Sequence, residues 1–345
     1  QQQIYDLIAQ PQHLLDSNYY HTMGDTAVMV YHTPPLDTNM FILVEYKTKH
    51  FGTFDIRDSM KAADPSIDIG YCIDFRTNML GKPSFDARLI QSPPNFLIDH
   101  PYNSNIEIAV NKNLFTEILY LAEEKMTHRF PDMQMSLDSI VNALSIPNSI
   151  GVGLTEWNIR LCGAGGCNRD YNGILGGLYV ANFFLQSYEA ERNGSINLKC
   201  SDHFAGVAEG TNLIHLFHYY GQTNSVFITP QSEAIRMVNE AVGENYVFID
   251  TAAITGNPKI EVLVETNTTG VFDTLLLPAV RCYGGIDTNT STFNIVLLNT
   301  DDSSDYTINI NIPPDWLADS AYFEMLSGFP LDSSTFSLDS TYLLT

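Results

Sequence analysis

Residues 54–242 alternate between strand-like and helix-like segments, and this alternation constrains the fold more than any other feature of the chain. The expected strands cover residues 66–72, 95–100, 150–155 and 196–200. The expected helices cover residues 56–63, 114–121, 173–191 and a stretch that begins at Thr229-Pro230 and ends at Gly243. Such a rhythm is typical of βα units that build a parallel sheet or barrel. We therefore predict an α/β fold with a (β/α) barrel portion over residues 51–243.

The remaining regions do not follow this rhythm. Short β-rich runs, separated by Asn, Asp, Gly, Ser and Thr clusters, occur at residues 246–249, 260–265, 293–298 and 306–312, and they predict an antiparallel β-sandwich over residues 244–345. Residues 1–50 stay unassigned, because each further βα unit needs about 30 residues and four more cannot fit there. The barrel is therefore expected to be incomplete in this chain.

The run Ile150-Gly-Val-Gly-Leu-Thr-Glu-Trp-Asn158 delivers a carboxylate, an indole and an amide at the end of an apolar strand. A carboxylate directly after apolar strand residues is costly inside a core. We expect Glu156 to emerge at the carboxyl end of its strand, where parallel α/β barrels place their catalytic groups. The alternative is an ordinary strand end without chemistry.

Charge limits the partners of the chain. Seventeen basic residues against 40 acidic ones give a formal net charge of −23 in 345 residues, which opposes binding to nucleic acid or to anionic membranes. No window reaches the roughly 18 apolar residues that span a bilayer, so no membrane span is expected. The start, Gln1-Gln-Gln, lacks a basic region followed by an apolar one, so any signal peptide is absent or already removed.

The cysteines and glycosylation sequons favour a secreted protein. Cys162 and Cys167 flank a short glycine-rich loop and can form a disulfide if the chain is exported. A zinc site on this pair needs two further ligands at recognisable spacing, and none is nearby, so we expect no metal. Sequons at Asn193, Asn267 and Asn289 are glycan acceptors in a secreted eukaryotic protein. We therefore expect an extracellular glycoprotein without a cofactor.

The order of four motifs carries a resemblance to a known family. They are Asp64-Pro-Ser-Ile-Asp-Ile-Gly70, Phe96-Leu-Ile-Asp-His-Pro-Tyr102, Thr155-Glu-Trp-Asn158 and Thr229-Pro-Gln-Ser-Glu-Ala234, followed by the β-rich region. This order resembles the C-terminal half of clan A glycoside hydrolases of the α-L-arabinofuranosidase type, over about residues 55–312. The resemblance implies the fifth, sixth and seventh strands of a barrel, then a sandwich domain. It also implies retaining hydrolysis by two carboxyl groups about 5 Å apart.

The resemblance implies roles for individual residues. Glu156 matches the catalytic nucleophile. Trp157 is expected either to form a wall of the sugar site or to pack at the rim. His100 and Tyr102 are expected to donate hydrogen bonds to substrate hydroxyls or to the nucleophile. The alternatives are a hydrogen-bonded core group for His100 and packing at the rim for Tyr102. Asn158 is expected to cap a loop more than to bind substrate.

The acid/base residue is where the chain departs from the family. Family members carry this glutamate in a Gly-Asn-Glu element at the end of the fourth barrel strand, and the sequence contains no Gly-Asn-Glu. Glu45, at the end of an apolar run, is the only glutamate before Asp64 and hence the only glutamate candidate. The alternative is an exposed carboxylate at a strand end.

Two functions stay open at this point. The first is a glycoside hydrolase-like extracellular protein that acts on polysaccharide once a second chain or an upstream segment completes its barrel. The second is a non-catalytic carbohydrate-binding or structural module of an extracellular assembly, built on a degenerate hydrolase fold. Both readings expect carbohydrate as a partner and allow a homo-oligomer or larger assembly.

Overall fold

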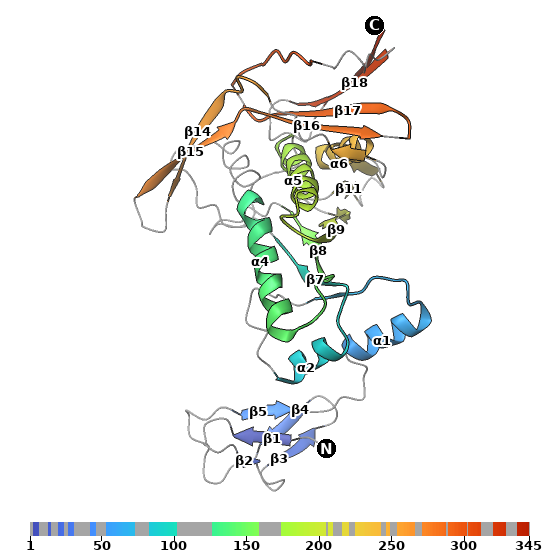
Figure 1. Cartoon of the computed structure of the whole chain (residues 1–345), viewed down its shortest axis with the longest axis vertical. Helices are drawn as coiled ribbons and strands as arrows, with labels where there is room; N and C mark the ends of the chain where they lie inside the picture. The colour runs from blue at the N-terminus through green and yellow to red at the C-terminus, as the bar shows by residue number, and fades with distance from the viewer. Residues whose placement is uncertain are drawn as a thin grey trace. The chain divides into compact units, whose positions relative to one another are not determined.

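The computed structural model of the chain describes the residues in the ranges 3–6, 13–14, 20–23, 27–30, 42–45, 53–72, 83–101, 126–158, 174–204, 206–209, 216–220, 225–242, 246–248, 254–265, 271–287, 289–301, 303–311, 320–328 and 337–344. The chain divides into two compact units, Gln1–Ile69 and Gly70–Thr345. Figure 1 shows the helices and strands of both units and labels most of them. Among the described residues, no helix combines the length and the apolar character needed to cross a membrane.

The described residues of the first unit form short antiparallel strands and the helix α1. β1 (Gln3–Asp6) pairs with both β2 (His13–Leu14) and β5 (Ile42–Glu45), while β3 (Tyr20–Met23) pairs with β4 (Ala27–Val30). α1 (Thr53–Ala63) ends before Asp64-Pro65, as predicted, because proline cannot continue helical hydrogen bonding. The resemblance assigns Glu45 to a parallel barrel strand, whereas the strand that it ends pairs antiparallel with β1.

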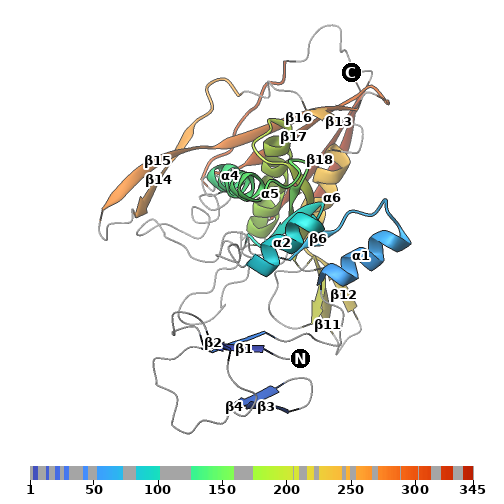
Figure 2. The same cartoon turned by 60° about the horizontal axis from the view of Figure 1, so that its bottom comes forward.

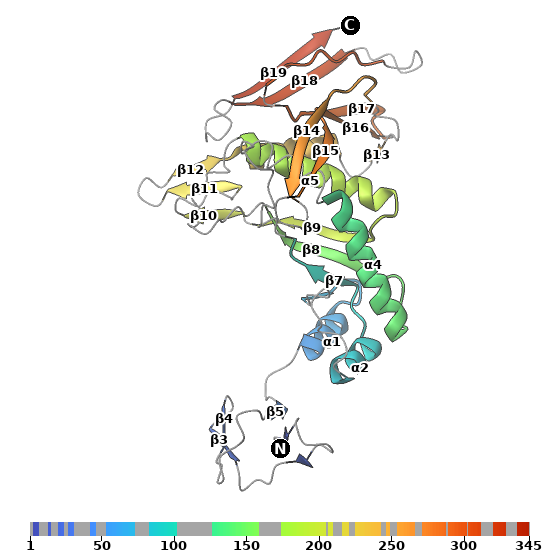
Figure 3. The same ribbon diagram turned by 90° about the vertical axis from the view of Figure 1, so that its left-hand side faces the viewer.

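The second unit begins with a parallel sheet of four strands in sequence order. They are β6 (Gly70–Tyr71), β7 (Phe96–Asp99), β8 (Gly151–Trp157) and β9 (Leu198–His203). The segments between them contain α2 (Pro83–Gln91), α4 (Met126–Leu144) and α5 (Ile174–Arg192). Figure 3 shows β7, β8 and β9 side by side, with α4 and α5 along them. The order of the four strands and the position of α5 match the prediction, although β6 is much shorter than the expected strand at 66–72. The helix expected at 114–121 lies outside the described residues, and α2 and α4 were not predicted.

The two faces of this sheet differ in what covers them. Leu97 pairs with Val152 and Asp99 with Leu154, and these four residues are buried on the face that packs against α4 and α5. Phe96 pairs with Gly151 and Ile98 with Gly153 on the opposite face, where Phe96 and Ile98 are half-buried. In a closed barrel this second face lines the interior.

Phe96 explains two glycines of the sheet. Its ring lies over the neighbouring strands, so that a Cβ built at Gly70 would lie 2.0 Å from the ring and one built at Gly153 would lie 2.4 Å from it. Any larger residue at either position would collide with the aromatic ring. Gly70 in β6 and Gly153 in β8 are therefore packing requirements of this face of the sheet.

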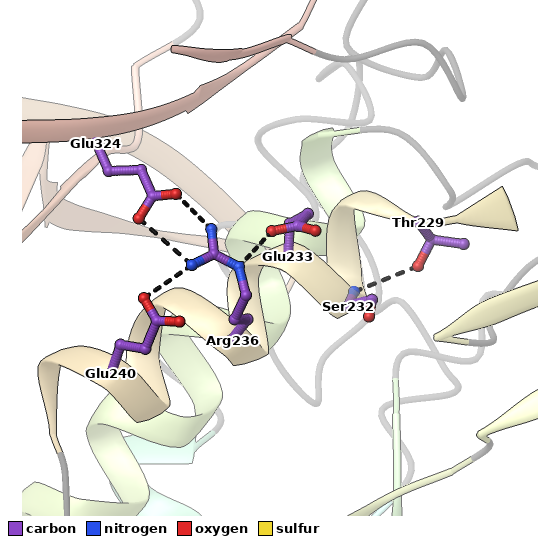
Figure 4. A network of polar contacts seen from close by, with 6 residues as sticks. All are labelled: Thr229, Ser232, Glu233, Arg236, Glu240 and Glu324. Atoms are coloured by element: carbon purple, nitrogen blue, oxygen red, sulfur yellow. Dashed lines mark hydrogen bonds and ion pairs between the residues drawn. The ribbon is translucent and has the colours of Figure 1, made fainter. Parts of the chain in front are cut away.

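A small sheet and a helix follow the parallel strands. β10 (Val207–Glu209) pairs parallel with β11 (Phe217–Tyr220), which pairs antiparallel with β12 (Ser225–Ile228). α6 (Pro230–Ala241) then begins where the sequence predicts. The Thr229 hydroxyl caps it by accepting a hydrogen bond from the Ser232 N–H at 3.3 Å (Figure 4).

The C-terminal region consists of antiparallel strands, as predicted. β13 (Tyr246–Phe248), β16 (Val280–Asp287) and β17 (Thr292–Asn299) form one sheet, and two further pairs are β14 (Lys259–Glu265) with β15 (Phe272–Pro278), and β18 (Ser320–Ser327) with β19 (Ser337–Leu344). The strand expected at 306–312 is wrong, because residues 306–311 form none. An alternating pattern makes a strand only where a partner strand takes up its hydrogen bonds.

One buried and one partly buried polar contact join the βα part of the second unit to these antiparallel strands. The Tyr283 hydroxyl of β16 donates to Asn182 Oδ1 of α5 at 3.3 Å, and Arg236 of α6 makes an ion pair with Glu324 of β18. Figure 2 shows α6 close to α5. The expected barrel portion from residue 70 onward and the expected sandwich thus belong to one compact unit, whereas residues 51–69 belong to the first unit. The domain boundaries after residues 50 and 243 stay predictions.

Candidate active site

The carboxyl ends of β7, β8 and β9 lie together at one edge of the parallel sheet. β7 ends at Asp99 and is followed by His100, β8 ends with Thr155, Glu156 and Trp157, and Trp157 pairs with His203 at the end of β9. Parallel strands bring their carboxyl ends to the same edge, so residues distant in sequence meet there. This edge is the candidate active site.

Glu156 lies at this edge with its carboxylate accessible. Its side chain is 40% exposed, and Oε2 lies 3.7 Å from Nδ1 of His100, whose side chain is 35% exposed. The imidazole is therefore close enough for an electrostatic contact, although the distance is longer than a direct hydrogen bond. A half-exposed carboxylate beside a half-exposed imidazole is open to a ligand and already oriented.

His100 has a second contact that the sequence alone did not suggest. Its Nε2 lies 3.1 Å from the hydroxyl oxygen of Thr155, a residue 55 positions later in the chain. Phe96, Ile98 and His100 follow one another at alternate positions, which places His100 on the interior face of the sheet. Thr155 and Glu156 thus contact the same imidazole through different ring nitrogens.

A register shift explains why Glu156 reaches His100. Simple alternation after Val152 and Leu154 would turn Glu156 toward the helices and Trp157 toward the interior face. The pairing of β8 with β9 shifts between Leu154 and Trp157, and the side chains exchange these directions. Such bulges are known to redirect side chains at functional sites.

Trp157 lies inside the protein. It is 0% exposed and its indole stacks on Phe183 of α5 with centroids 3.7 Å apart and an interplanar angle of 14°. The rings of Phe184 and His203 lie edge-on to the indole, with centroid distances of 4.9 Å and 5.1 Å. The packing alternative therefore fits Trp157 better than a sugar-binding wall, because a sugar stacks on an exposed indole face and Trp157 is 0% exposed.

Asn158 ties two strand ends together. Its Nδ2 donates a hydrogen bond to the carbonyl of Phe204 at 2.6 Å, and the Phe204 N–H donates to the carbonyl of Trp157 at 3.0 Å. Asn158 is 0% exposed. This position fits the loop-capping expectation.

Sequence reasoning missed two features near this edge. His203 ends β9 and lies edge-on to Trp157, and its place after the fourth predicted strand was a usable signal. Asp99 is 3% exposed and lies 4.0 Å from the guanidinium of Arg129 on α4, which fastens that helix to the strand preceding His100. The adjacent Asp99 and His100 in the sequence do not indicate that Asp99 contacts an arginine on a later helix.

Several predicted residues lie outside the described residues or away from this edge. Tyr102, Cys162, Cys167 and Asn267 lie outside the described residues, as does the side chain of Glu45. Asn193 and Asn289 are exposed, in the turn after α5 and in the turn between β16 and β17. Within the described part of the chain, no group of three or more His, Cys, Asp or Glu residues could hold a metal ion.

Comparisons with solved structures find related folds. The chain matches α-L-arabinofuranosidases from Thermotoga maritima (TM-score 0.54, 15% identity), Thermotoga petrophila (0.56, 14%) and Bifidobacterium longum (0.57, 11%). The matches cover 84%, 87% and 84% of this chain but only 56%, 60% and 59% of those chains. Neither the family models nor the curated proteins that were compared match the sequence. The expected likeness to the α-L-arabinofuranosidase fold is thus confirmed, over less than two thirds of the length of these enzymes. The incomplete barrel stays a prediction.

Proposed function

We propose that the chain carries the nucleophile of a retaining glycoside hydrolase that acts on polysaccharide. The observation that supports this best is the half-exposed carboxylate of Glu156 beside His100 at the carboxyl end of a parallel strand. The structural neighbours are named α-L-arabinofuranosidases, so α-L-arabinofuranosides are the substrates to test first.

The proposed reaction has two steps. The Glu156 carboxylate attacks the anomeric carbon while the glycosidic C–O bond breaks, and the leaving oxygen takes a proton from a second carboxyl group. Water then attacks the glycosyl ester, the second carboxylate takes the proton from this water, and Glu156 is released. The sugar keeps its anomeric configuration because each step inverts it.

The second carboxyl group belongs, in our proposal, to a segment that completes the barrel. Retaining enzymes hold the two groups about 5–5.5 Å apart, which requires a strand end facing Glu156 across the barrel. The antiparallel pairing of β5 does not match a barrel strand, so Glu45 is the weaker candidate for this role. An upstream segment or a second chain with further βα units is the stronger one.

The full-length native protein and its Glu156→Gln variant test the nucleophile. We expect hydrolysis of an aryl α-L-arabinofuranoside by the wild type, with product of retained configuration by NMR, and a loss of at least about 10⁴-fold in the variant. Melting temperatures should agree, because the amide replaces a half-exposed carboxylate of the same shape. Glu191→Gln, an exposed glutamate at the end of α5, is the matched control. An unchanged rate in Glu156→Gln would rule out this role.

A mass and peptide map of the native material, denatured without reduction, tests the completing segment. We expect a polypeptide or an upstream region that supplies further βα units and a glutamate at a strand end. Native mass then reports whether copies assemble. If this chain alone accounts for the native material, the hydrolase proposal loses its acid/base residue.

A non-catalytic carbohydrate-binding or structural module is the second candidate, and the antiparallel setting of β5 favours it. A binding module would bind oligosaccharide without turnover, and Glu156→Gln would leave both its affinity and its assembly unchanged. Isothermal titration with arabino-oligosaccharides, run beside the hydrolysis assay, separates the two.

We also infer an extracellular location from the acidic surface and the sequons. The exposed turns that hold Asn193 and Asn289 make both side chains accessible to a glycosyl transferase. Treatment of native material with a glycosidase specific for N-glycans should lower its mass. An unchanged mass would contradict the glycoprotein proposal.

A further inference from the structure

We propose that Thr155 is a positioning residue that fixes the tautomer of His100, so that the ring presents its Nδ1–H to the carboxylate of Glu156. The inference rests on the proposed role of Glu156 as nucleophile. It starts from one arrangement in the structure: Thr155 Oγ1 lies 3.1 Å from Nε2, and Glu156 Oε2 lies 3.7 Å from Nδ1 of the same ring.

The two neutral tautomers of His100 differ sharply in this setting. With the proton on Nε2, the ring would donate to Thr155 and would turn the lone pair of Nδ1 toward a carboxylate. With the proton on Nδ1, the N–H dipole points at the carboxylate, and the hydroxyl of Thr155 donates to Nε2. A hydroxyl can donate or accept, whereas an ionised carboxylate only accepts. The carboxylate therefore selects the Nδ1–H tautomer, and the hydroxyl satisfies the opposite nitrogen.

The arrangement orients the nucleophile as well as the histidine. Nδ1 and Oε2 are 0.5–0.8 Å too far apart for an ordinary hydrogen bond of about 2.9–3.2 Å, and such contacts commonly shorten when substrate binds. A ring held at Nε2 by Thr155 can close this gap by a small tilt. Without the hydroxyl, the ring is free to rotate or to change tautomer, and Glu156 loses a fixed donor.

Variants at position 155 separate the hydroxyl from the shape of the side chain. Thr155→Val keeps the branched β-strand shape and removes the donor, while Thr155→Ser keeps the donor. We expect Thr155→Val to lower kcat about five- to tenfold with KM changed less than twofold, since one hydrogen bond is lost. The kcat of Thr155→Ser should stay within about twofold of the wild-type value. Thr274→Val, an exposed strand threonine in β15, is the control for the substitution itself.

A spectroscopic measurement tests the tautomer without any turnover. The ring ¹⁵N shifts of the full-length protein, labelled at its histidines, distinguish protonated from unprotonated nitrogens, and His100→Gln identifies the His100 signals. We expect the proton on Nδ1 in the wild type and in Thr155→Ser, and a shift toward Nε2–H or a mixture in Thr155→Val.

The outcomes distinguish this inference from the proposed function. The expected shifts in a protein that hydrolyses no glycoside would support the positioning role of Thr155 and reject the enzyme. A proton on Nε2 in the wild type, or an unchanged tautomer in Thr155→Val, would overturn the inference. It would also be overturned if an active enzyme kept its full kcat in Thr155→Val.

Discussion

At the scale of single residues, one irregularity in β8 decides which side chain at its end is accessible from solvent. The register shift between Leu154 and Trp157 places the indole of Trp157 under α5 and leaves Glu156 on the side of His100. Trp157 then serves the core: a buried indole in full contact with Phe183 stabilises the junction of strand and helix. The carboxylate of Glu156 is the accessible group of the two.

Trp157→Ala should therefore act on stability. We expect the free energy of unfolding to fall by roughly 3–5 kcal/mol, because the change leaves a large cavity between β8 and α5. Phe323→Ala, at a residue that is 47% exposed, should cost less than about 1 kcal/mol in the same denaturant titration. A sugar-binding wall would behave differently: Trp157→Ala would lose affinity for sugar at nearly unchanged stability.

The ring of Phe96 makes a second prediction at this scale. Gly153→Ala should lower the free energy of unfolding by about 1–3 kcal/mol, because the new methyl group meets a ring atom at 2.4 Å. In a Phe96→Leu background this loss should shrink, with a coupling above about 0.5 kcal/mol. Gly206→Ala, where the added atom meets open space, is the control. Equal losses in both backgrounds would show that the ring is not the obstacle.

At the scale of elements, α6 packs against α5 on one side and makes an ion pair with β18 on the other. Gly177 of α5 lets the helices approach closely, since a Cβ there would lie 2.9 Å from the carbonyl oxygen of Pro230. On the other side Arg236 contacts Glu324 of β18 at 2.5 Å and also Glu233 and Glu240 of its own helix, at 2.7 and 2.8 Å (Figure 4). The carboxylate of Glu324, followed by that of Glu233, raises the pKa of Arg236, so the guanidinium stays charged. α6 thus links the βα part to the last hairpin.

Removing this guanidinium should loosen the link. We expect Arg236→Met to lower the free energy of unfolding by about 1–2 kcal/mol, because a partly buried Glu324 loses its cation. Arg236→Lys should retain only part of the stability that Arg236→Met loses. A lysine ammonium cannot contact two oxygens of Glu324 and two other carboxylates in one plane. Arg88→Met on α2 is the exposed control and should change stability by less than about 0.5 kcal/mol. If Arg236→Met matched this control, the contact would contribute nothing measurable.

At the scale of the whole second unit, the βα part and the antiparallel strands share a buried polar junction. Tyr283 of β16 is 6% exposed and its hydroxyl reaches Asn182 of α5 at 3.3 Å, while Gln186 donates to the same Asn182 oxygen at 3.2 Å. Burial raises the pKa of Tyr283 to about 12, because the phenolate would lose its hydration there. The two parts are thus coupled through a group that must stay neutral.

This coupling predicts alkaline destabilisation. The unfolded chain releases the Tyr283 proton near its ordinary pKa of 10.0, whereas the folded protein keeps it to about 12. The unfolded state therefore binds fewer protons between these values, and stability falls as pH rises through this window, by about 2–3 kcal/mol in all. Below pH 10.0 the proton of Tyr283 stays bound in both states, so this pH dependence of stability is absent. Unfolding titrations from pH 9 to pH 12 should show a shallower decline in Tyr283→Phe; identical slopes would contradict the assignment.

The sequence by itself determined the order of the four parallel strands, the helices α1, α5 and α6, the antiparallel character of the C-terminal region and the position of Glu156 at a strand end. These features follow from local periodicity, capping residues and the cost of burying a charge, which a short window of sequence records.

Only the tertiary structure decided which groups meet. The contact of His100 with Thr155, the exchange of Glu156 and Trp157, the fit of Phe96 over two glycines and the antiparallel pairing of β5 all depend on strand register between distant segments. Register is set by packing and hydrogen bonding across strands, so a pattern along one strand does not specify it. The same reason explains residues 306–311, whose alternating pattern forms no strand.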